Sequence, residues 1–300
     1  MVPVPLPRRG QVPRRRAPVP ALDAVGRRGA LSNEFERQGS RTVLTRSSCS
    51  SPWHYLPPSY LDDSGCAYTW LVNPSGGLVG GDHVSVEAQL HAGAHVLMTS
   101  PSANRVYRSL SAPAVQEVDL LVGPDARLEW LPEVTIPFAG SRVCQSIHVD
   151  LAPGATAVVW DAIASGRVAM RERWAFTAVE NEICIRTPLG ESVVERYHLV
   201  PGRLPESVGL VDSWGYVASL FVIGDVVDTD VWKRLDVVLA AILEQRPGLV
   251  LGAVSTPAVS GLAVKFVARS APDLTETLGV IWAAVRKYLW NLPVPNLRRY

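Results

Sequence analysis

From about residue 40 onward, short runs of apolar residues alternate with turns that contain glycine or proline, a pattern typical of β-strands. The runs are rich in β-branched and aromatic residues, which favour strands. The predicted strands cover residues 41–45, 67–72, 86–90, 94–98, 118–122, 126–130, 147–151, 155–159, 173–177, 182–186 and 215–222. The pattern therefore predicts a mainly β protein.

Three of these segments repeat one arrangement. The strands that begin at Val86, Val118 and Ile147 are each followed by a glycine turn and a second strand, at offsets of 32 and 29 residues. Such self-similarity is typical of stacked β units that bury their apolar faces against one another. A meander of hairpins with glycine turns at similar intervals is the alternative. The repeat favours stacked β-sheets with a solenoid-like, β-helical topology.

Two α-helices are predicted in the C-terminal half. Asp228 and Asp230 can begin a helix that runs to about Arg246, where Pro247-Gly248 stops it. Residues 270–273 can begin a second helix, because a proline and an acid lie in its first turn. Both helices have an apolar stripe, and such stripes usually pack on the protein's own sheet.

The N-terminal region differs in composition from the rest of the chain. Residues 1–29 contain seven arginines and one acid, and six prolines lie in the first twenty positions. A segment of this kind cannot bury enough apolar surface to become ordered, and it lacks the apolar region of a secretory signal peptide. We divide the chain into a disordered extension (1–35), a β domain (36–292) and an extended C-terminal tail (293–300).

Composition excludes several classes of protein. The 300 residues are 47% hydrophobic, which is enough for a substantial core. A net charge of +1 disfavours a nucleic-acid binder, and no apolar run reaches the roughly eighteen residues that a membrane span requires. The cysteines show no C-x-x-C spacing, so we expect reduced thiols and a cytoplasmic location. They are Cys49, Cys66, Cys144 and Cys184.

A glycine-rich loop spans residues 73–82 and ends at Asp82. Four glycines in six positions imply positive φ angles or close backbone contacts. The spacing fits neither a dinucleotide-binding loop nor a P-loop, and the alternating run after Asp82 predicts a strand rather than a helix. Taken alone, the loop is predicted to be a tight turn between two strands. Its glycines are Gly76, Gly77, Gly80 and Gly81.

The residues alone indicate no catalytic centre. No histidine lies in an H-E-x-x-H motif, and no G-x-S-x-G motif is present. A Ser/His/Asp triad is not excluded, because such triads assemble in space. His91 and His95 flank a turn and could form a surface metal site, although unpaired surface histidines are favoured.

Three acids lie next to apolar segments. Asp82 ends the glycine loop, Asp161 follows an apolar run, and Glu195 lies beside Arg196. Carboxylates in such positions are exposed at strand ends or buried with a partner. Arg167 and Arg196 are available partners. Buried ion pairs that fix the fold and a direct functional role both remain open.

Several segments together resemble the UreD (also called UreH) family of urease accessory proteins, over about residues 40–290. The most specific are the glycine loop and the Arg105-Val-Tyr-Arg-Ser segment after it. The others follow in the family's order, at residues 129–133, 136–140, 161 with 166–167, and 194–196.

The resemblance implies a maturation factor rather than an enzyme, with a solenoid-like β fold and two helices. Members of this family bind the urease apoprotein and UreF, and recruit the GTPase UreG through UreF. The assembly delivers nickel to urease, and a tunnel through the UreD-like subunit is the implied route. The resemblance implies no catalytic residue, no tightly bound cofactor, Ni²⁺ only in transit, and neither nucleic acid nor membrane as partner.

The resemblance also assigns roles to particular residues. Asp82, Asp161 and Glu195 match acidic positions that are candidates for lining the tunnel, with Arg167 as their companion. Sparse carboxylates suit a passing Ni²⁺, because a closed set of histidines and cysteines would trap the ion. The motif positions implied to matter are Gly76, Gly77, Gly80, Gly81, Arg105, Tyr107, Arg108, Arg167 and Glu172.

The chain departs from the family pattern at three places, and two other classes of function stay open. Arg171 stands where the family has glycine, Arg105 where it usually has lysine, and residues 295–300 replace its Pro-Arg-Ile-Trp ending. A β-solenoid hydrolase or transferase would be favoured by a closed pocket with perturbed titratable groups. A carbohydrate- or nucleic-acid-binding domain is disfavoured, because the aromatic residues show no regular stacking pattern.

Overall fold

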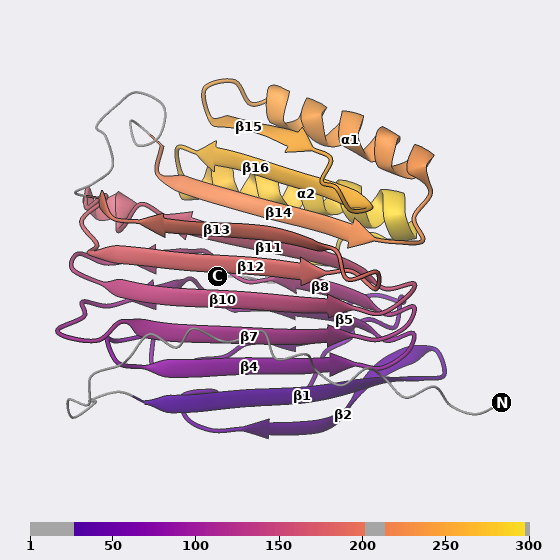
Figure 1. Cartoon of the computed structure of the whole chain (residues 1–300), viewed down its shortest axis with the longest axis horizontal. Helices are drawn as coiled ribbons and strands as arrows, with labels where there is room; N and C mark the ends of the chain where they lie inside the picture. The colour runs from indigo at the N-terminus through magenta and orange to yellow at the C-terminus, as the bar shows by residue number, and fades with distance from the viewer. Residues whose placement is uncertain (1–26, 202–213, 298–300) are drawn as a thin grey trace.

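Two β-sheets face each other in residues 27–201 and 214–297, which the computed structural model describes, and two helices cover the outer side of the second sheet (Figure 1). Sheet I has the strand order β13-β12-β10-β7-β4-β1-β2. Its central strands run parallel, and β2 and β13 lie antiparallel at its two edges. The bounds are β1 Arg28–Gln38, β2 Arg41–Cys49, β4 His83–Leu90, β7 Ala114–Val122, β10 Arg142–Leu151, β12 Ala178–Arg186 and β13 Ser192–Leu199.

Sheet II has the order β15-β16-β14-β11-β8-β5-β3, and the short strands β6 and β9 pair beside it. The strands are β3 Ala67–Trp70, β5 His95–Thr99, β6 Asn104–Val106, β8 Arg127–Leu131, β9 Thr135–Pro137, β11 Thr156–Ala164, β14 Tyr216–Gly224, β15 Val250–Ser255 and β16 Gly261–Ala268. The helices are α1 Thr229–Glu244 and α2 Ala271–Trp290, with a 3-10 turn at Val168–Met170.

The chain winds between the sheets, as the sequence repeat predicts. Val86, Val118 and Ile147 are direct neighbours in register on β4, β7 and β10. The strand after each turn lies in the opposite sheet, so each repeat is one coil of a solenoid rather than a hairpin. The structure therefore confirms a mainly β, solenoid-like fold with two helices in the C-terminal half.

The predicted helix starts are confirmed, and both are capped by side chains. The carboxylate of Asp228 accepts a hydrogen bond from the backbone N–H of Asp230, and the Ser270 hydroxyl accepts one from Asp273. These caps satisfy backbone donors that have no partner inside a helix. Neither described helix combines the length and apolar character needed to cross a bilayer. All four cysteines lie in the described ranges and are free thiols.

Some predicted boundaries are wrong. β1 begins at Arg28, inside the predicted extension 1–35, and its inward positions include Leu31, Asn33 and Phe35. The polar Asn33 concealed this alternation, and residues 1–26 lie outside the described ranges. Residues 173–177 form no strand, because Trp174 has a φ of 52°. Strands β6, β9, β13, β15 and β16 were not predicted either, and residues 291–297 have no regular secondary structure.

Side chains alternate along β11 between two apolar layers. Val159 faces sheet I and packs in a core with Phe35 and Trp130, whereas Trp160 points the other way and packs with Ile281 and residues of both helices. The whole of β11 is buried, because one face meets sheet I and the other meets the helices. Sheet II is thus the central layer of a three-layer protein.

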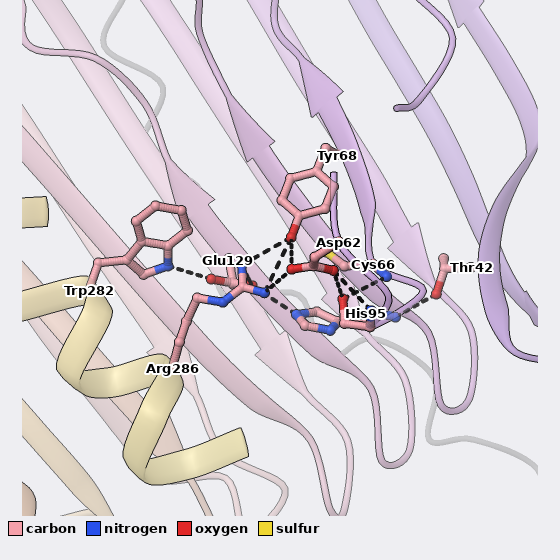
Figure 2. Close-up of polar contacts among 9 residues, drawn as sticks. Thr42, Asp62, Cys66, Tyr68, His95, Glu129, Trp282 and Arg286 are labelled. Atoms are coloured by element: carbon pink, nitrogen blue, oxygen red, sulfur yellow. Dashed lines mark hydrogen bonds and ion pairs between the residues drawn. The ribbon is translucent and has the colours of Figure 1, made fainter. Parts of the chain in front are cut away.

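A buried polar network attaches α2 to sheet II (Figure 2). The guanidinium of Arg286 is fully buried and lies 3.3 Å from Glu129 Oε1 and 2.9 Å from Asp62 Oδ2. It also donates to the Tyr68 hydroxyl, while the indole N–H of Trp282 donates to Glu129 Oε2. A buried charge is tolerated only with partners of this kind, so this network fixes where α2 can sit.

We expect Arg286→Met to lower the free energy of unfolding by about 3 to 5 kcal/mol, because it leaves two carboxylates buried without their cation. Urea unfolding followed by circular dichroism measures the change. Lys287→Met is the matched control on the exposed side of α2 and should unfold close to wild type. Equal midpoints for wild type and Arg286→Met would contradict this role.

Candidate functional site

Polar side chains interrupt the apolar layer between the two sheets. We call them the polar seam. Gln116, Gln145, Asn181 and Tyr197 form one row across sheet I, because their strands place them in register. Asp161, Ser219 and Lys265 form a second row, across sheet II. The complete seam is Asn104, Gln116, Gln145, Asp161, Asn181, Glu195, Tyr197, Ser219 and Lys265.

Asp161 is the centre of the seam. It comes from β11, and three side chains of sheet I donate hydrogen bonds to its carboxylate. Gln145 lies 3.0 Å from Oδ1, and Asn181 and the Tyr197 hydroxyl lie 3.1 and 3.3 Å from Oδ2. None of these donors is a cation, so the carboxylate is held between the sheets by neutral groups.

Burial controls the ionisation of Asp161. Removal from water raises its pKa from 3.8 to about 6, and the nearby charge of Glu195 adds to this rise. The hydrogen bonds from Gln145 and Tyr197 oppose it. The phenol of Tyr197 has a pKa well above its usual value of 10, because of burial and the charges of Asp161 and Glu195. Asp161 is thus a buried acid able to exchange its proton near neutral pH.

Glu195 joins the seam to the protein surface. It projects from β13, where Ser219 Oγ lies 2.7 Å from its Oε1 and Lys265 Nζ lies 2.5 Å from its Oε2. The Glu195 side chain is 9% exposed and that of Lys265 is 60% exposed. The seam therefore reaches solvent where β13 ends sheet I and β16 continues sheet II.

The other end of the seam opens into a cavity of about 80 Å³. Its walls include Gly76 and Gly77 at one side and Gln145 and Asp161 at the other. Asn104 also lines it and donates to Gln116 across 3.2 Å. Glu195 does not belong to the cavity wall, so the path beyond Asp161 consists of packed polar side chains.

The two most specific motifs bind each other beside this cavity. Leu78 and Arg105 share a backbone hydrogen bond of 2.7 Å, and the backbone N–H of Tyr107 donates back to Leu78. A Cβ atom at Gly77 would lie 2.3 Å from the Arg105 carbonyl oxygen, and one at Gly80 would lie 2.8 Å from Ser109. The glycines are required because two backbones touch here. The loop does join two strands, β3 and β4, as predicted.

Asp82 lies apart from the seam. Its carboxylate accepts hydrogen bonds from the backbone N–H groups of Arg27 and Val79, both at 2.9 Å. Asp82 does not line the cavity. It is also not among the described hydrogen-bond partners of Asp161. Its geometry is that of a carboxylate that closes the glycine loop and anchors the start of β1.

The two available arginines pair with other acids in the structure. Arg167 forms an ion pair with Glu172 and lies over the ring of Phe138 at 4.8 Å, and Arg196 pairs with Glu182. The Arg167 pair lowers the pKa of Glu172. Arg171 adopts a φ of 59°, which explains why glycine suits that position.

Arg167, Glu172, Tyr107 and Arg108 instead gather on one surface. Tyr107 packs edge-on against Phe138 with ring centroids 5.1 Å apart, and Glu172 accepts a hydrogen bond from the backbone of Ala139. The side chain of Arg108 lies against Gly140. These four residues therefore form a surface next to the glycine loop. Arg105, which precedes Tyr107 in the same motif, is also exposed.

The prediction of unpaired surface histidines is also wrong. His95 is buried, and its Nε2 lies 2.8 Å from Glu129. His91 lies 4.0 Å from Glu34. The sequence could not indicate the burial of His95, because the side chains above it come from α2, almost two hundred residues later.

Sequence reasoning missed the neutral members of the seam. Gln145 and Asn181 lie two residues before the buried Ile147 and Ile183, so the alternation along β10 and β12 already places them inward. Their contact with Asp161 depends on how the two sheets face each other. Apart from the ammonium of Lys265 at its exposed end, the described seam consists of carboxylates, amides and hydroxyls, with neither thiol nor imidazole. Such oxygen ligands bind divalent cations weakly and reversibly.

Comparisons with known proteins agree on one family. The family profile described as "UreD urease accessory protein" matches residues 27–299. A urease accessory protein UreD of Haloarcula marismortui is 31% identical over 287 residues, covering 94% of both chains. Proteins of the same name from Cupriavidus necator and Deinococcus radiodurans are 29% and 37% identical, covering 89% and 67% of this chain and 92% and 74% of their own lengths.

Gly77→Ala should lower the free energy of unfolding by about 3 to 5 kcal/mol, because the added methyl group meets the Arg105 backbone. Gly93→Ala is the matched control, since Gly93 also has a positive φ but open space around it. It should cost about 1 to 2 kcal/mol. Thermal and urea unfolding measure both. Similar losses for the two variants would exclude close backbone contact as the reason for Gly77.

The raised pKa of Asp161 predicts a pH-dependent stability. Below pH 3.8 the acid is protonated in both folded and unfolded states, and above about pH 6 the folded protein must hold a buried charge. Wild type should therefore lose on the order of 2 to 3 kcal/mol relative to Asp161→Asn as pH rises through this window.

Urea unfolding at several pH values between 4 and 7 gives this difference, and its slope with pH is the informative quantity. The free energy of unfolding of Asp161→Asn at any single pH also reflects the hydrogen bonds that the substitution changes. Parallel pH profiles for the two proteins would contradict the buried-acid interpretation.

Proposed function

The chain belongs to the UreD family of urease accessory proteins, and it therefore has a role in urease maturation. We propose that it is a non-enzymatic scaffold that binds the urease apoprotein and UreF, and through UreF the GTPase UreG, in the cytoplasm. We further propose that Ni²⁺ passes through this subunit along the polar seam, with Asp161 and Glu195 as its successive carboxylate ligands.

One observation supports this route above the others. Two buried carboxylates occupy a single line of polar side chains, which starts at the cavity beside the glycine loop and ends at the exposed Lys265. Polar groups are costly inside an apolar layer unless they are hydrogen-bonded. A line of them across the whole sandwich provides oxygen ligands along a route that is otherwise apolar.

The ligands of the seam suit transfer rather than storage. Ni²⁺ binds imidazole and thiolate more tightly than isolated carboxylates and amides. Asp161 can exchange its proton for a metal ion, because its hydrogen bonds come from neutral groups that can rotate. The amides of Gln145 and Asn181 each offer an oxygen as well as the N–H that now faces Asp161.

Exposed apolar side chains support protein partners. One group lies in the segment before β3, where Tyr55, Leu56, Tyr60 and Leu61 are each about 40% exposed. A second lies on α1 and β15, which contact each other, at Val237 and Leu251. Exposed apolar side chains gathered in one short segment, as in the segment before β3, are typical of interaction sites, and a scaffold for UreF and urease requires such sites.

The alternative is a β-solenoid hydrolase or transferase. The raised pKa of Asp161 beside a cavity favours it, since such acids are common at catalytic sites. Against it, two amides and a phenol hold the carboxylate, and no thiol or imidazole lies in the described seam to act as nucleophile or base. A carboxylate with these neighbours is positioned but activates no nucleophile.

Reconstitution tests the maturation role. Apo-urease is incubated with nickel, bicarbonate, GTP, UreF and UreG, with and without this chain. Activation that requires the chain, together with a stable complex in size-exclusion chromatography, is the expected result. If the chain binds none of the three partners and leaves activation unchanged, the scaffold role is contradicted and the enzyme alternative is favoured.

Seam variants test the nickel route separately. Asp161→Asn and Glu195→Gln should each lower the activation rate by about tenfold, the scale on which groups that support metal ligands act, while complex formation stays normal. Asp150→Asn is the matched control, because Asp150 lies on the exposed face of sheet I. Full activation by both seam variants would contradict the passage of Ni²⁺ along the seam, but it would not contradict the scaffold role.

A further inference from the structure

A second set of potential metal ligands lies on the opposite face of sheet II from the seam. Cys66 precedes β3, His95 begins β5, and Glu129 lies in β8, three neighbouring strands of sheet II. The Cys66 thiol, an imidazole nitrogen of His95 and a carboxylate oxygen of Glu129 all lie within 4.8 Å of one another. Figure 2 shows these side chains converging beneath α2.

The surroundings orient two of these side chains. The backbone N–H of His95 donates to Thr42 Oγ1 at 2.8 Å, and the ring of Trp290 packs edge-on against the imidazole at 5.2 Å. Glu129 Oε2 accepts the indole N–H of Trp282, which leaves Oε1 directed at His95 Nε2, 2.8 Å away. Metal ligands are typically held by outer hydrogen bonds of this kind.

The charged groups around the cluster balance without an added ion. Asp62 and Glu129 supply two negative charges, and Arg286 supplies one positive charge. Arg127, which interacts electrostatically with Glu129 and Cys66, supplies a second positive charge. The indication of a metal ion is therefore the geometry of the three ligand atoms and not the sum of the charges.

We propose that Cys66, His95 and Glu129 bind one divalent cation of the zinc class. Sulfur, nitrogen and oxygen donors in one group are the ligands that Zn²⁺ takes in proteins, and three protein ligands leave one position for a further ligand. The three ligand atoms lie within 4.8 Å of one another, close to the separations of atoms that share one Zn²⁺ with bonds of about 2.0 to 2.3 Å. The proposal departs from the expectation that the chain holds no tightly bound metal.

This site differs from the seam in how accessible a bound ion would be to solvent. The side chains of Cys66 and Glu129 are fully buried and that of His95 is 4% exposed, so an ion here has no path for rapid exchange. It would enter as the chain folds, and its binding would add to the stability of the folded state. The ion would join three strands of sheet II directly beneath α2.

Expression of the full chain in medium containing Zn²⁺ or Co²⁺ tests the proposal. After dialysis against a weak chelator, elemental analysis should find about one metal ion per chain. The Co²⁺ form should show a thiolate-to-metal charge-transfer band. Cys66→Ser should lose both the ion and the band, and Cys49→Ser should keep both, because Cys49 is exposed and lies outside the cluster.

A direct hydrogen bond between His95 Nε2 and Glu129 Oε1, which lie 2.8 Å apart, with no ion bound to either group, is the alternative. In that case wild type retains no metal, Co²⁺ gives no charge-transfer band, and protein refolded in chelator has the thermal midpoint of the original preparation. Those three results overturn the proposal even if Cys66→Ser fails to fold, since all of them are measured on wild type. Retained metal that survives Cys66→Ser in a folded variant also overturns it.

Discussion

The structure depends on one constraint, the burial of Asp161 between two sheets that are otherwise apolar. A carboxylate in this layer must find donors on the opposite sheet, and it finds them in Gln145, Asn181 and Tyr197. These contacts fix the register of β10, β12 and β13 against β11, because a shift by one residue would place apolar side chains against the charge. The same constraint raises the pKa of Asp161 to about 6, because burial disfavours its charged form.

Sheet II has polar groups on both faces, and the two groups have different properties. The seam faces sheet I, contains oxygen ligands, and reaches a cavity at one end and solvent at the other. The network around Glu129 and Arg286 faces α2, is sealed, and contains charges that hold the helix in place. Weak ligands with access suit an ion in passage, and strong interactions without access suit a fixed structure. Glycine-mediated contact between residues 73–82 and 104–109 closes the end of the sandwich where the cavity lies.

The sequence was sufficient for much of the fold and for part of the site. Regular offsets between Val86, Val118 and Ile147 indicated the coils of the solenoid, and Asp228 and Ser270 marked the helix starts, since both signals are local. Of the three acids that the sequence singled out, Asp161 and Glu195 lie in one polar seam, whereas Asp82 lies apart from it. The hydrogen-bond partners of these acids could not be predicted, because contacts such as that between Asp161 and Gln145 form only when two sheets pack face to face. Arg167 was assigned to the wrong acids, and His95 to the surface, for the same reason: only the packed structure shows which side chains cover them.

Isotopic nickel transfer tests the proposed passage of Ni²⁺ along the seam most directly. UreG loaded with labelled Ni²⁺ is added to the preassembled complex of this chain, UreF and apo-urease, and label in urease is followed with time in the presence of a chelator that removes free ions. We predict protected, rapid transfer with wild type and slow transfer with Asp161→Asn at equal complex occupancy. Chelator-sensitive transfer that is equally fast in both proteins would show that the ion travels through solvent, and would contradict the account.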